Sequence, residues 1–349
     1  MKSSAFWRTC WAAMLCLALA MCVASARMGA TSSPSRFPQR LSDTGLFRDV
    51  GSLLVDPRHG AFSPQYPLWT DAAQKRRWVS LPAGATIDVS DVDAWDFPTG
   101  TRFWKEFSFG GRRVETRMLV KSSDTGWDFA SYVWNEAQTD AELAPSTGLR
   151  NVAEVAPGKQ HSIPSIEDCR ACHDSARTEI LGFTALQLSD DRDGEAPHRE
   201  LVTDDMLTLR DLVEEQRLSP ARPEFVSTPP RIPASSPRER AVLGYLSTNC
   251  GSCHNTTSSL DSLKLTFRQP AYGGGLAVAG PSLERKTKWD RPGAVPDKTR
   301  VIDRATPEHG ALLFRMRSRR PTSQMPPLGT VLPDHDAIDL VTRWAREER

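Results

Sequence analysis

The sequence predicts an α+β multidomain protein, with an N-terminal antiparallel β domain of sandwich-like type followed by a mostly helical region. Its 349 residues exceed what one hydrophobic core usually organises. Residues 78–134 alternate between apolar and polar side chains as strands do, whereas after Pro164 apolar residues recur at helical spacing. Six prolines between Pro220 and Pro237 mark a boundary between two domains.

Composition excludes several classes of protein. The 44 Lys and Arg nearly balance the 43 Asp and Glu, which excludes a strongly basic nucleic-acid binder. A quarter of the residues are charged and ten are Trp, a composition that a disordered chain lacks. No apolar run is long enough for a bilayer span, so a multi-pass membrane protein is excluded and no transmembrane span is expected in the mature chain.

The N-terminus has the pattern of an export signal. Two basic residues precede an uncharged, mostly apolar run over residues 11–24, and Ala24-Ser25-Ala26 offers a cleavage site. We therefore expect a signal peptide over 1–26 and a periplasmic protein. A lipid anchor on Cys22 is the alternative, although Met21 stands where a lipidation signal has a small residue.

Cleavage leaves four cysteines, which form two copies of one motif: Cys169-Arg-Ala-Cys172-His173 and Cys250-Gly-Ser-Cys253-His254. Two cysteines three apart on a helical turn face the same way, so both thiols can bond the vinyl groups at one edge of a haem. The next histidine then ligates the iron. The sequence predicts two haem c groups, with covalent bonds to Cys169, Cys172, Cys250 and Cys253 and iron ligands His173 and His254.

Cys-x-x-Cys motifs have three other common uses. Paired Cys-x-x-Cys motifs can bind zinc, but a zinc ribbon brings its two pairs much closer in sequence. A redox dithiol would need a βαβ setting, which is not evident here. Disulfides suit an exported protein, yet they do not explain a histidine directly after both motifs.

The β domain is expected to contain a hairpin and a third strand. Phe103, Lys105, Phe107 and Phe109 share one face of the first strand, and residues 114–120 form the second. Gly110-Gly111 between them is a two-residue turn signal. A polar loop over 122–126 leads to the third strand, residues 127–134. The aromatic residues of this region are expected to be core.

Four helices are expected in the C-terminal half. The first follows the first haem motif with the stripe Ile180, Phe183 and Leu186. The second begins near Asp204 and carries the stripe Met206, Leu209, Leu212 and Val213. The third opens with Ser236-Pro237, a good N-cap and first-turn pair, and ends at Asn249. The last, around 336–348, puts Ile338, Val341 and Trp344 on one face.

The remaining ligand of each iron decides what the haems can do. For the second haem the candidate is Met325, because the two prolines after it stiffen the segment, and a thioether raises the reduction potential. For the first haem the candidate is His198, with Met206, His161, His309 or an open position as alternatives. His59 and His335 are expected at the surface. The cluster Arg315, Arg317, Arg319 and Arg320 is either a solvated face or a site for haem propionates or an acidic partner.

Residues 237–349 resemble a class I cytochrome c domain in their order of helix, Asn249-Cys-Gly-Ser-Cys-His254, Met-Pro-Pro loop and closing helix with Trp344. The offset of Gly244-Tyr245 from Cys250 differs from the mitochondrial type, so the helix crossing is expected to differ. The mature chain also resembles a poorly characterised family of exported bacterial dihaem c-type cytochromes. The matching segments are Tyr66-Pro-Leu-Trp-Thr-Asp71, Trp95-Asp-Phe-Pro-Thr-Gly-Thr101, Glu115-Thr-Arg117, Trp134-Asn-Glu136, Leu181-Gly-Phe-Thr-Ala-Leu-Gln-Leu188 and Met325-Pro-Pro-Leu-Gly-Thr330.

This resemblance implies haem binding and electron transfer in the periplasm, and it assigns no substrate. The expected organisation is a signal peptide (1–26), an extended lead-in (27–60), a β domain (61–160), a first haem-binding helical segment (161–219), a Pro-rich linker (220–237) and a cytochrome c-like domain with the second haem (238–349).

Three functions are compatible with these features. The leading one is a carrier of single electrons with an unidentified redox partner protein and no nucleic-acid partner. The second is an enzyme of the dihaem peroxidase type, with an open first haem. The third is the electron-accepting cytochrome subunit of an exported dehydrogenase.

Overall fold

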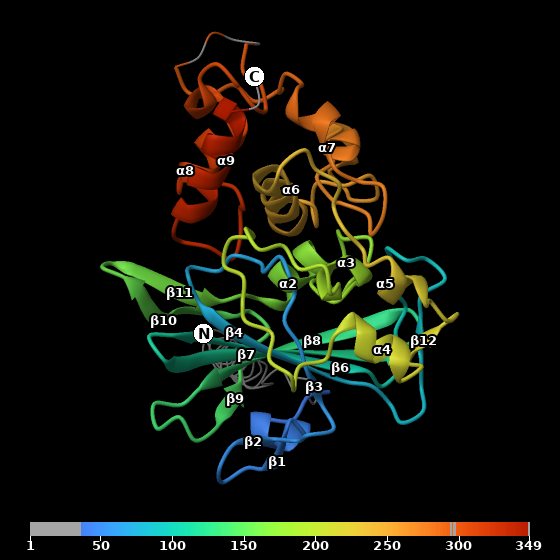
Figure 1. Ribbon diagram of the computed structural model, residues 1–349. Coiled ribbons are helices and arrows are strands. Elements are labelled where there is room, and N and C mark those ends of the chain that lie inside the picture. The colour runs from blue at the N-terminus through green and yellow to red at the C-terminus, as the bar shows by residue number, and fades with distance from the viewer. Residues whose placement is uncertain (1–35, 294, 296–297, 348–349) are drawn as a thin grey trace, which may run out of the picture. The chain divides into compact units, whose positions relative to one another are not determined.

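The computed structural model describes residues 36–293, 295 and 298–347. The predicted signal peptide and the possible lipidation site at Cys22 lie outside these residues. From Gln39 onward the chain belongs to one compact unit. It is a mixed α/β structure with a large antiparallel sheet in its N-terminal half, which confirms the broad fold class (Figure 1). Among the described residues, no helix has the length and apolar character that crossing a membrane requires.

The elements have the following bounds. The strands are β1 (Phe47–Asp49), β2 (Leu54–Val55), β3 (Gly60–Ala61), β4 (Gln74–Ser80), β5 (Ile87–Asp88), β6 (Arg102–Phe109), β7 (Arg112–Ser123), β8 (Gly126–Trp134), β9 (Ala141–Leu143), β10 (Leu149–Ala156), β11 (Lys159–Ile163) and β12 (Leu218–Ser219). The α-helices are α2 (Ile166–His173), α3 (Ala185–Leu188), α4 (Leu209–Glu214), α5 (Glu224–Ser227), α6 (Pro237–Asn249), α7 (Leu276–Leu283), α8 (Ala311–Arg317) and α9 (His335–Glu347). The 3-10 helices are η1 (Leu41–Thr44), η2 (Asp261–Leu263) and η3 (Pro307–His309).

The large sheet has six antiparallel strands in the order β3-β4-β6-β7-β8-β9. The predicted hairpin is confirmed: β6 and β7 meet at Gly110 and Gly111, which both have positive φ, the conformation that glycine adopts without steric cost. The predicted third strand is β8. Within the expected lead-in, η1 and the β1–β2 hairpin are formed.

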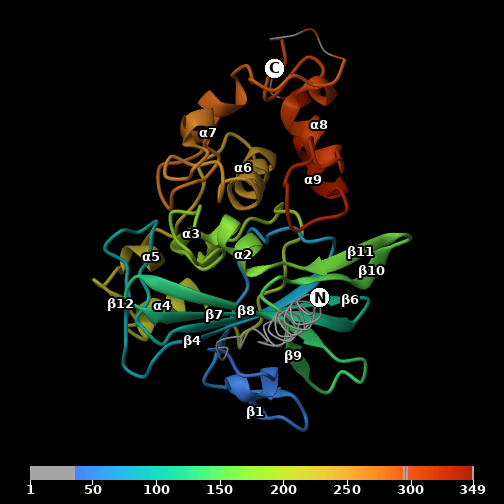
Figure 2. The same cartoon turned by 180° about the vertical axis from the view of Figure 1, so that it is seen from behind.

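One face of the large sheet packs on helices and connecting segments. Phe183 is fully buried against it, with its ring 4.8 Å from that of Phe62 and 5.3 Å from that of Phe103. The other three sheets have two strands each among the described residues, so this face packs on helices and not on a second large sheet, as a sandwich would require. In both views α2 and α3 lie between the sheet and the helices α6–α9 (Figures 1 and 2).

Two predicted helices are shorter than the periodicity indicated. Ile180 and Phe183 precede helical structure, since α3 begins only after Thr184, whose side chain accepts a hydrogen bond from the backbone of Gln187. Likewise α4 begins at Leu209, after Thr208 forms a capping box with Asp211. Met206 instead pairs with Ala61 beside β3, where the N–H of Leu207 donates to the Ala61 carbonyl over 2.6 Å.

The two C-terminal helices that the sequence predicted are confirmed. Ser236 caps α6 by accepting from the N–H of Glu239, and Pro237 occupies the first turn. In α9 the predicted stripe Ile338, Val341 and Trp344 is buried, and it belongs to one hydrophobic core with residues of α6 and α8. The end of α6 is thereby fixed in a packed region.

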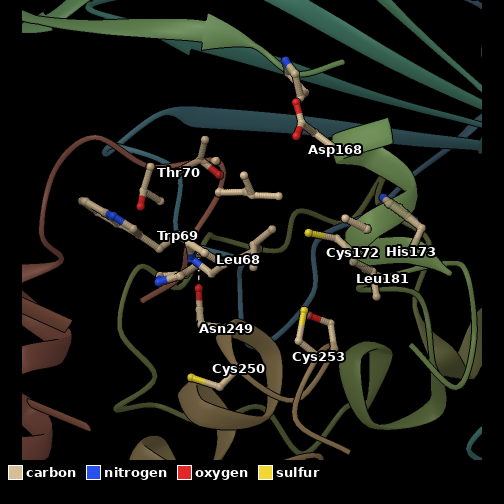
Figure 3. Close-up of a pocket in the computed structure, with 18 of the residues that line it drawn as sticks. Leu68, Trp69, Thr70, Asp168, Cys172, His173, Leu181, Asn249, Cys250 and Cys253 are labelled. Carbon is tan, nitrogen blue, oxygen red and sulfur yellow. Dashed lines mark hydrogen bonds between the residues drawn. The ribbon is translucent and has the colours of Figure 1, made fainter. Parts of the chain in front are cut away.

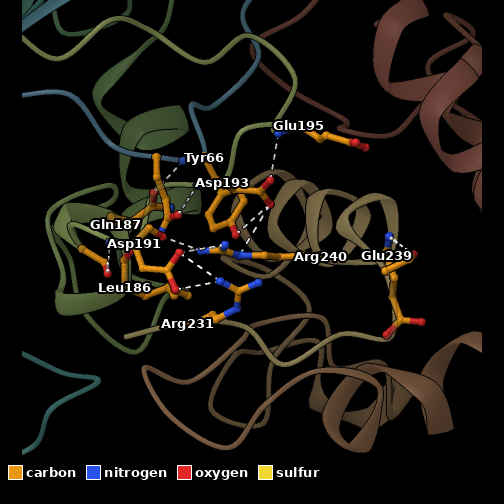
Figure 4. A network of polar contacts seen from close by, with 12 residues as sticks. Tyr66, Leu186, Gln187, Asp191, Asp193, Glu195, Arg231, Glu239 and Arg240 are labelled. Carbon is orange, nitrogen blue, oxygen red and sulfur yellow. Dashed lines mark hydrogen bonds and ion pairs between the residues drawn. The ribbon is translucent and has the colours of Figure 1, made fainter. Parts of the chain in front are cut away.

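A polar network, buried at Tyr66, Asp193 and Arg240, attaches α6 to the segment after α3 (Figure 4). Arg240 of α6 donates to Asp191 over 3.0 Å, and its Nε lies 3.8 Å from Asp193. The Tyr66 hydroxyl donates to Asp193 over 3.1 Å, while Arg231 pairs with Asp191 at 2.8 Å. The Tyr66 ring lies against Gly244, where a Cβ atom would overlap the ring. This network and this close approach set the position of α6.

Candidate functional site

A cavity of about 1130 Å³ lies inside the compact unit (Figure 3). Its walls are mostly apolar, as is typical of cofactor sites, and its volume exceeds the usual range of about 300–1,000 Å³ for a pocket that holds one ligand. The predicted haem residues line it together: Cys169, Cys172, His173, Cys250, Cys253, His254 and Met325.

The first motif occupies the last turn and a half of α2. Ser165 and Asp168 form a capping box that starts the helix, so Cys169 and Cys172 are held on one helical face. At the helix end, Nδ1 of His173 is hydrogen-bonded to the Glu179 carbonyl. A histidine ligand typically donates its other ring N–H in this way, which leaves Nε2 free for a metal. Burial lowers the pKa of His173 to about 4, which favours the neutral, ligating imidazole.

The second motif begins where α6 ends, with Cys250 as the C-cap. The Asn249 side chain accepts from the backbone N–H of Trp69 over 2.8 Å and donates to the Tyr245 carbonyl over 3.1 Å. Next along the chain, His254 has a buried Nδ1 without a hydrogen-bond partner, and burial lowers its pKa. An imidazole in this state is neutral and available as a ligand.

The two motifs lie next to each other. The side chains of Cys172 and Cys253 interact, which raises the pKa of Cys172 and lowers that of Cys253 to about 6. Asn255, just after the second motif, donates to the Ser175 carbonyl, just after the first, over 3.1 Å. Figure 3 shows both cysteine side chains directed into the space between α2 and the end of α6. Segments far apart in sequence therefore form one site.

The four motif cysteines are not joined to one another by disulfides. The four cysteines are free thiols. Within the part of the chain that the structure describes, no three His, Cys, Asp or Glu side chains are grouped to hold a metal ion.

The Met325 loop faces the same cavity. The Met325 N–H donates to the Arg315 carbonyl over 3.0 Å, and Asp71 accepts from the N–H groups of Val331 and Leu332 at 2.8 Å each. Residues 66–71 therefore contact α6, including its last residue Asn249, and the segment that follows the Met325 loop. That bracing role was not evident from the sequence, because it depends on contacts between distant segments.

The predicted arginine cluster is divided. Arg315 lines the cavity, stacks on Trp289 at 5.1 Å and donates to the Ser323 carbonyl over 3.1 Å. Arg317 donates to Thr342, and Arg319 donates to nearby backbone carbonyls. Only the first of these three reaches the cavity wall.

The candidates for the first iron's other ligand lie elsewhere. His198 is half-buried, with Nε2 2.9 Å from both carboxylate oxygens of Asp334 and its ring 4.8 Å from that of Trp69. His161 is buried 3.5 Å from Glu115, Met206 lies beside Ala61, and His309 is exposed in η3. Among the described residues that line the cavity, the imidazoles are His173 and His254, and the thioethers are Met118 and Met325.

The two histidines predicted at the surface differ in exposure. His335 is exposed, as expected, whereas His59 is half-buried and bonded to the Gly45 carbonyl at 2.8 Å.

Sequence reasoning missed a row of cations on the sheet face that lines the cavity. Arg77, Lys105 and Arg117 lie directly opposite one another on β4, β6 and β7, and all three line the cavity. The available signal was Lys105 itself, a charged residue between Phe103 and Phe107 on an otherwise apolar face.

Comparisons with protein-family models, with curated proteins and with solved structures found no match.

Proposed function

We propose that this protein is an exported dihaem c-type cytochrome that transfers single electrons. The observation that carries the proposal is that both Cys-x-x-Cys-His motifs and Met325 line one large, mostly apolar cavity. Nothing in the primary sequence requires two motifs and a methionine so far apart to meet. Their meeting around a common space is what two neighbouring haem c groups need.

The residues present suit that group. Cys169 and Cys172 would hold one haem, and Cys250 and Cys253 the other, with His173, His254 and Met325 as iron ligands. When bound, haem c supplies a reversible one-electron couple of the iron. The chain contributes neutral imidazoles, a mostly apolar wall and the cations that line the cavity, among them Arg315 near His254.

The C-terminal part is proposed to be a class I cytochrome c-like domain. In support, α6 and α9 share one core, Trp344 is buried in it, and the Met325 loop faces the cavity that the second motif lines. Together with the proposed export signal, this arrangement suits a periplasmic electron carrier that meets a redox partner protein.

One observation favours a second candidate, a haem enzyme of the peroxidase type. None of His198, Met206, His161 and His309 is among the residues that line the cavity, so nothing among them is placed to close the iron at the first motif. One-electron transfer does not require that position to be closed, whereas peroxide chemistry requires it to be open.

Two measurements test the proposal. Protein exported in a host that attaches haem c should carry two covalent haems by intact mass. Each double variant, Cys169→Ala with Cys172→Ala or Cys250→Ala with Cys253→Ala, should lose exactly one. Exported protein without covalent haem would refute the cytochrome assignment.

The second measurement separates carrier from enzyme. EPR of the oxidised protein and CO addition to the reduced protein report whether each iron is closed. Two low-spin irons without CO binding support the carrier alone. A high-spin, CO-binding iron that disappears in the Cys169→Ala, Cys172→Ala variant supports the peroxidase-type function.

A further inference from the structure

The central cation of the row Arg77–Lys105–Arg117 lacks a carboxylate partner. Arg77 pairs with Glu200 at 2.6 Å, and Arg117 pairs with Glu115 on its own strand. Among the described residues, no carboxylate oxygen lies within ion-pair distance of Lys105. Its Nζ instead lies 5.0 Å from the centre of the Phe107 ring.

This arrangement is unfavourable for an ammonium group. Lys105 lies directly opposite a like charge on each side, which destabilises a sheet, and it faces the interior of the protein. Lys105 is half-buried, and a contact with one ring face only partly offsets the desolvation of its ammonium group. Consistent with this, burial and then Arg77 hold the pKa of Lys105 well below its usual value. An anion in the cavity would balance the positive charge of Lys105 and favour its protonated form.

The row also lies beside the first motif. Arg117 is close enough to Cys169 and Cys172 for its charge to act on both thiols, and Lys105 acts likewise on His173. The neighbouring row of paired residues on the same sheet includes Phe129, and the centre of its ring lies 5.1 Å from that of His173. Any group bonded to Cys169 and Cys172 would therefore extend over this face of the sheet.

We propose that Lys105 binds a carboxylate of the prosthetic group held by Cys169, Cys172 and His173, with Arg77 and Arg117 flanking it. The inference rests on the proposed function and deepens it, because it assigns the anchor for the acidic edge of the first haem. It makes Lys105 a positioning residue. The ammonium keeps that carboxylate ionised inside the protein and balances its charge.

The test is the pH dependence of the two reduction potentials of the holoprotein. Lys105→Gln removes the positive charge that balances the ionised carboxylate. The reduction potential of the first haem should therefore fall at high pH. It should recover at low pH, where the carboxylate takes up a proton. Other titratable and charged groups nearby are Lys75 and Arg77 on β4, Glu115 and Arg117 on β7, Glu200 and His173. They are the same in variant and wild type, so the difference between the two profiles isolates Lys105.

Two variants make this result specific. Lys105→Arg should restore the flat profile of the wild type. Lys121→Gln removes a lysine of the same sheet that pairs with Asp96 at 2.8 Å and does not line the cavity, so neither potential should change. A Lys105→Gln profile identical to the wild type, or an equal shift in Lys121→Gln, would overturn the proposal.

The bound carboxylate has one other possible source, a free small anion. Titrating wild-type protein with acetate at constant ionic strength distinguishes the two. No saturable change in either potential is expected; a saturable change would assign the site to a free anion and overturn the proposal. Loss of covalent haem from the wild type would instead be a failure of the proposed function, and intact mass detects it independently.

Discussion

The side chains of Cys172 and Cys253 line the same cavity and each shifts the pKa of the other, although the two residues belong to separate motifs. Thioether bonds at these positions would place the edges of two haems near each other. Neighbouring haems of this kind would couple their electronic transitions.

This proximity predicts an excitonic signal. The Soret circular dichroism of the holoprotein should be bisignate, since two neighbouring chromophores share their excitation. The Cys169→Ala, Cys172→Ala variant, with one haem, should show a single band. A wild-type spectrum equal to the sum of the two single-haem variants would contradict the side-by-side arrangement.

Replacing Met325 should change one haem. Met325→Ala removes the proposed thioether ligand, so the second iron should become high-spin and its potential should fall by about 0.1–0.3 V, a fraction of the roughly 0.8 V that axial ligands span. Met316→Ala is the matched control, because Met316 is buried in the core of the same region. It should lower the free energy of unfolding by about 2–5 kcal/mol without changing either spin state. An unchanged visible spectrum in Met325→Ala would refute the ligand assignment.

Gly244 should not tolerate a methyl group. In Gly244→Ala the new Cβ would overlap the Tyr66 ring, so the free energy of unfolding should fall by about 1–3 kcal/mol through overpacking. In Gly194→Ala, at an exposed turn, the new Cβ meets no atom within 4 Å, so stability should change by no more than about 0.5 kcal/mol. Urea denaturation followed by tryptophan fluorescence measures both. Equal effects of the two substitutions would mean that Tyr66 does not pack on α6 in this way.

The Arg77–Glu200 pair should make the free energy of unfolding depend on pH in the acidic range. Burial raises the pKa of Glu200, but the charge and hydrogen bonds of Arg77 outweigh it, and the net shift is downward from 4.5. A lowered folded-state pKa contributes stability above the unfolded value, and this contribution is lost as the pH falls below about 4.5 through the folded value. Breaking a buried pair costs about 3–5 kcal/mol. The Glu200 side chain is 26% exposed, so we expect about 1–3 kcal/mol for Glu200→Gln at pH 7.

Denaturation at pH 7 and pH 3 checks this prediction. The difference between wild type and Glu200→Gln should shrink at the lower pH, because the wild-type carboxylate is then losing its charge. The exposed Glu136, changed to Gln, serves as the control and should have little effect at either pH. A difference that is independent of pH would show that the substitution acts through packing and not through charge.

Local signals in the sequence identified local structure. Gly110-Gly111 identified the hairpin, and Ser236-Pro237 identified the start of α6, because turn and cap chemistry is contained in a few adjacent residues. Where the N-cap residue and the apolar periodicity indicated different helix starts, the helix begins at the N-cap. Thr208 starts α4 later than the apolar stripe indicated, and the segment before it pairs with β3.

The sequence identified residues that line the cavity, but not how they come together. The Cys-x-x-Cys-His spacing named six residues that all line it, yet nothing local indicated that Cys172 and Cys253 would lie near each other. The cation row arises from the register of β4, β6 and β7, which places Arg77, Lys105 and Arg117 opposite one another. Register depends on pairing between strands, so a single sequence read along its length does not reveal it.

The cavity has a consequence for biogenesis. Its wall is built from residues between Phe62 and Val331, and all four attachment thiols line it. On the proposed function, the thioether bonds would form before the Met325 loop and α9 pack beside the second motif, because both segments follow that motif in the chain. Maturation of the protein would then follow one order: secretion, attachment of both groups, and only afterwards closure of the C-terminal segments over them.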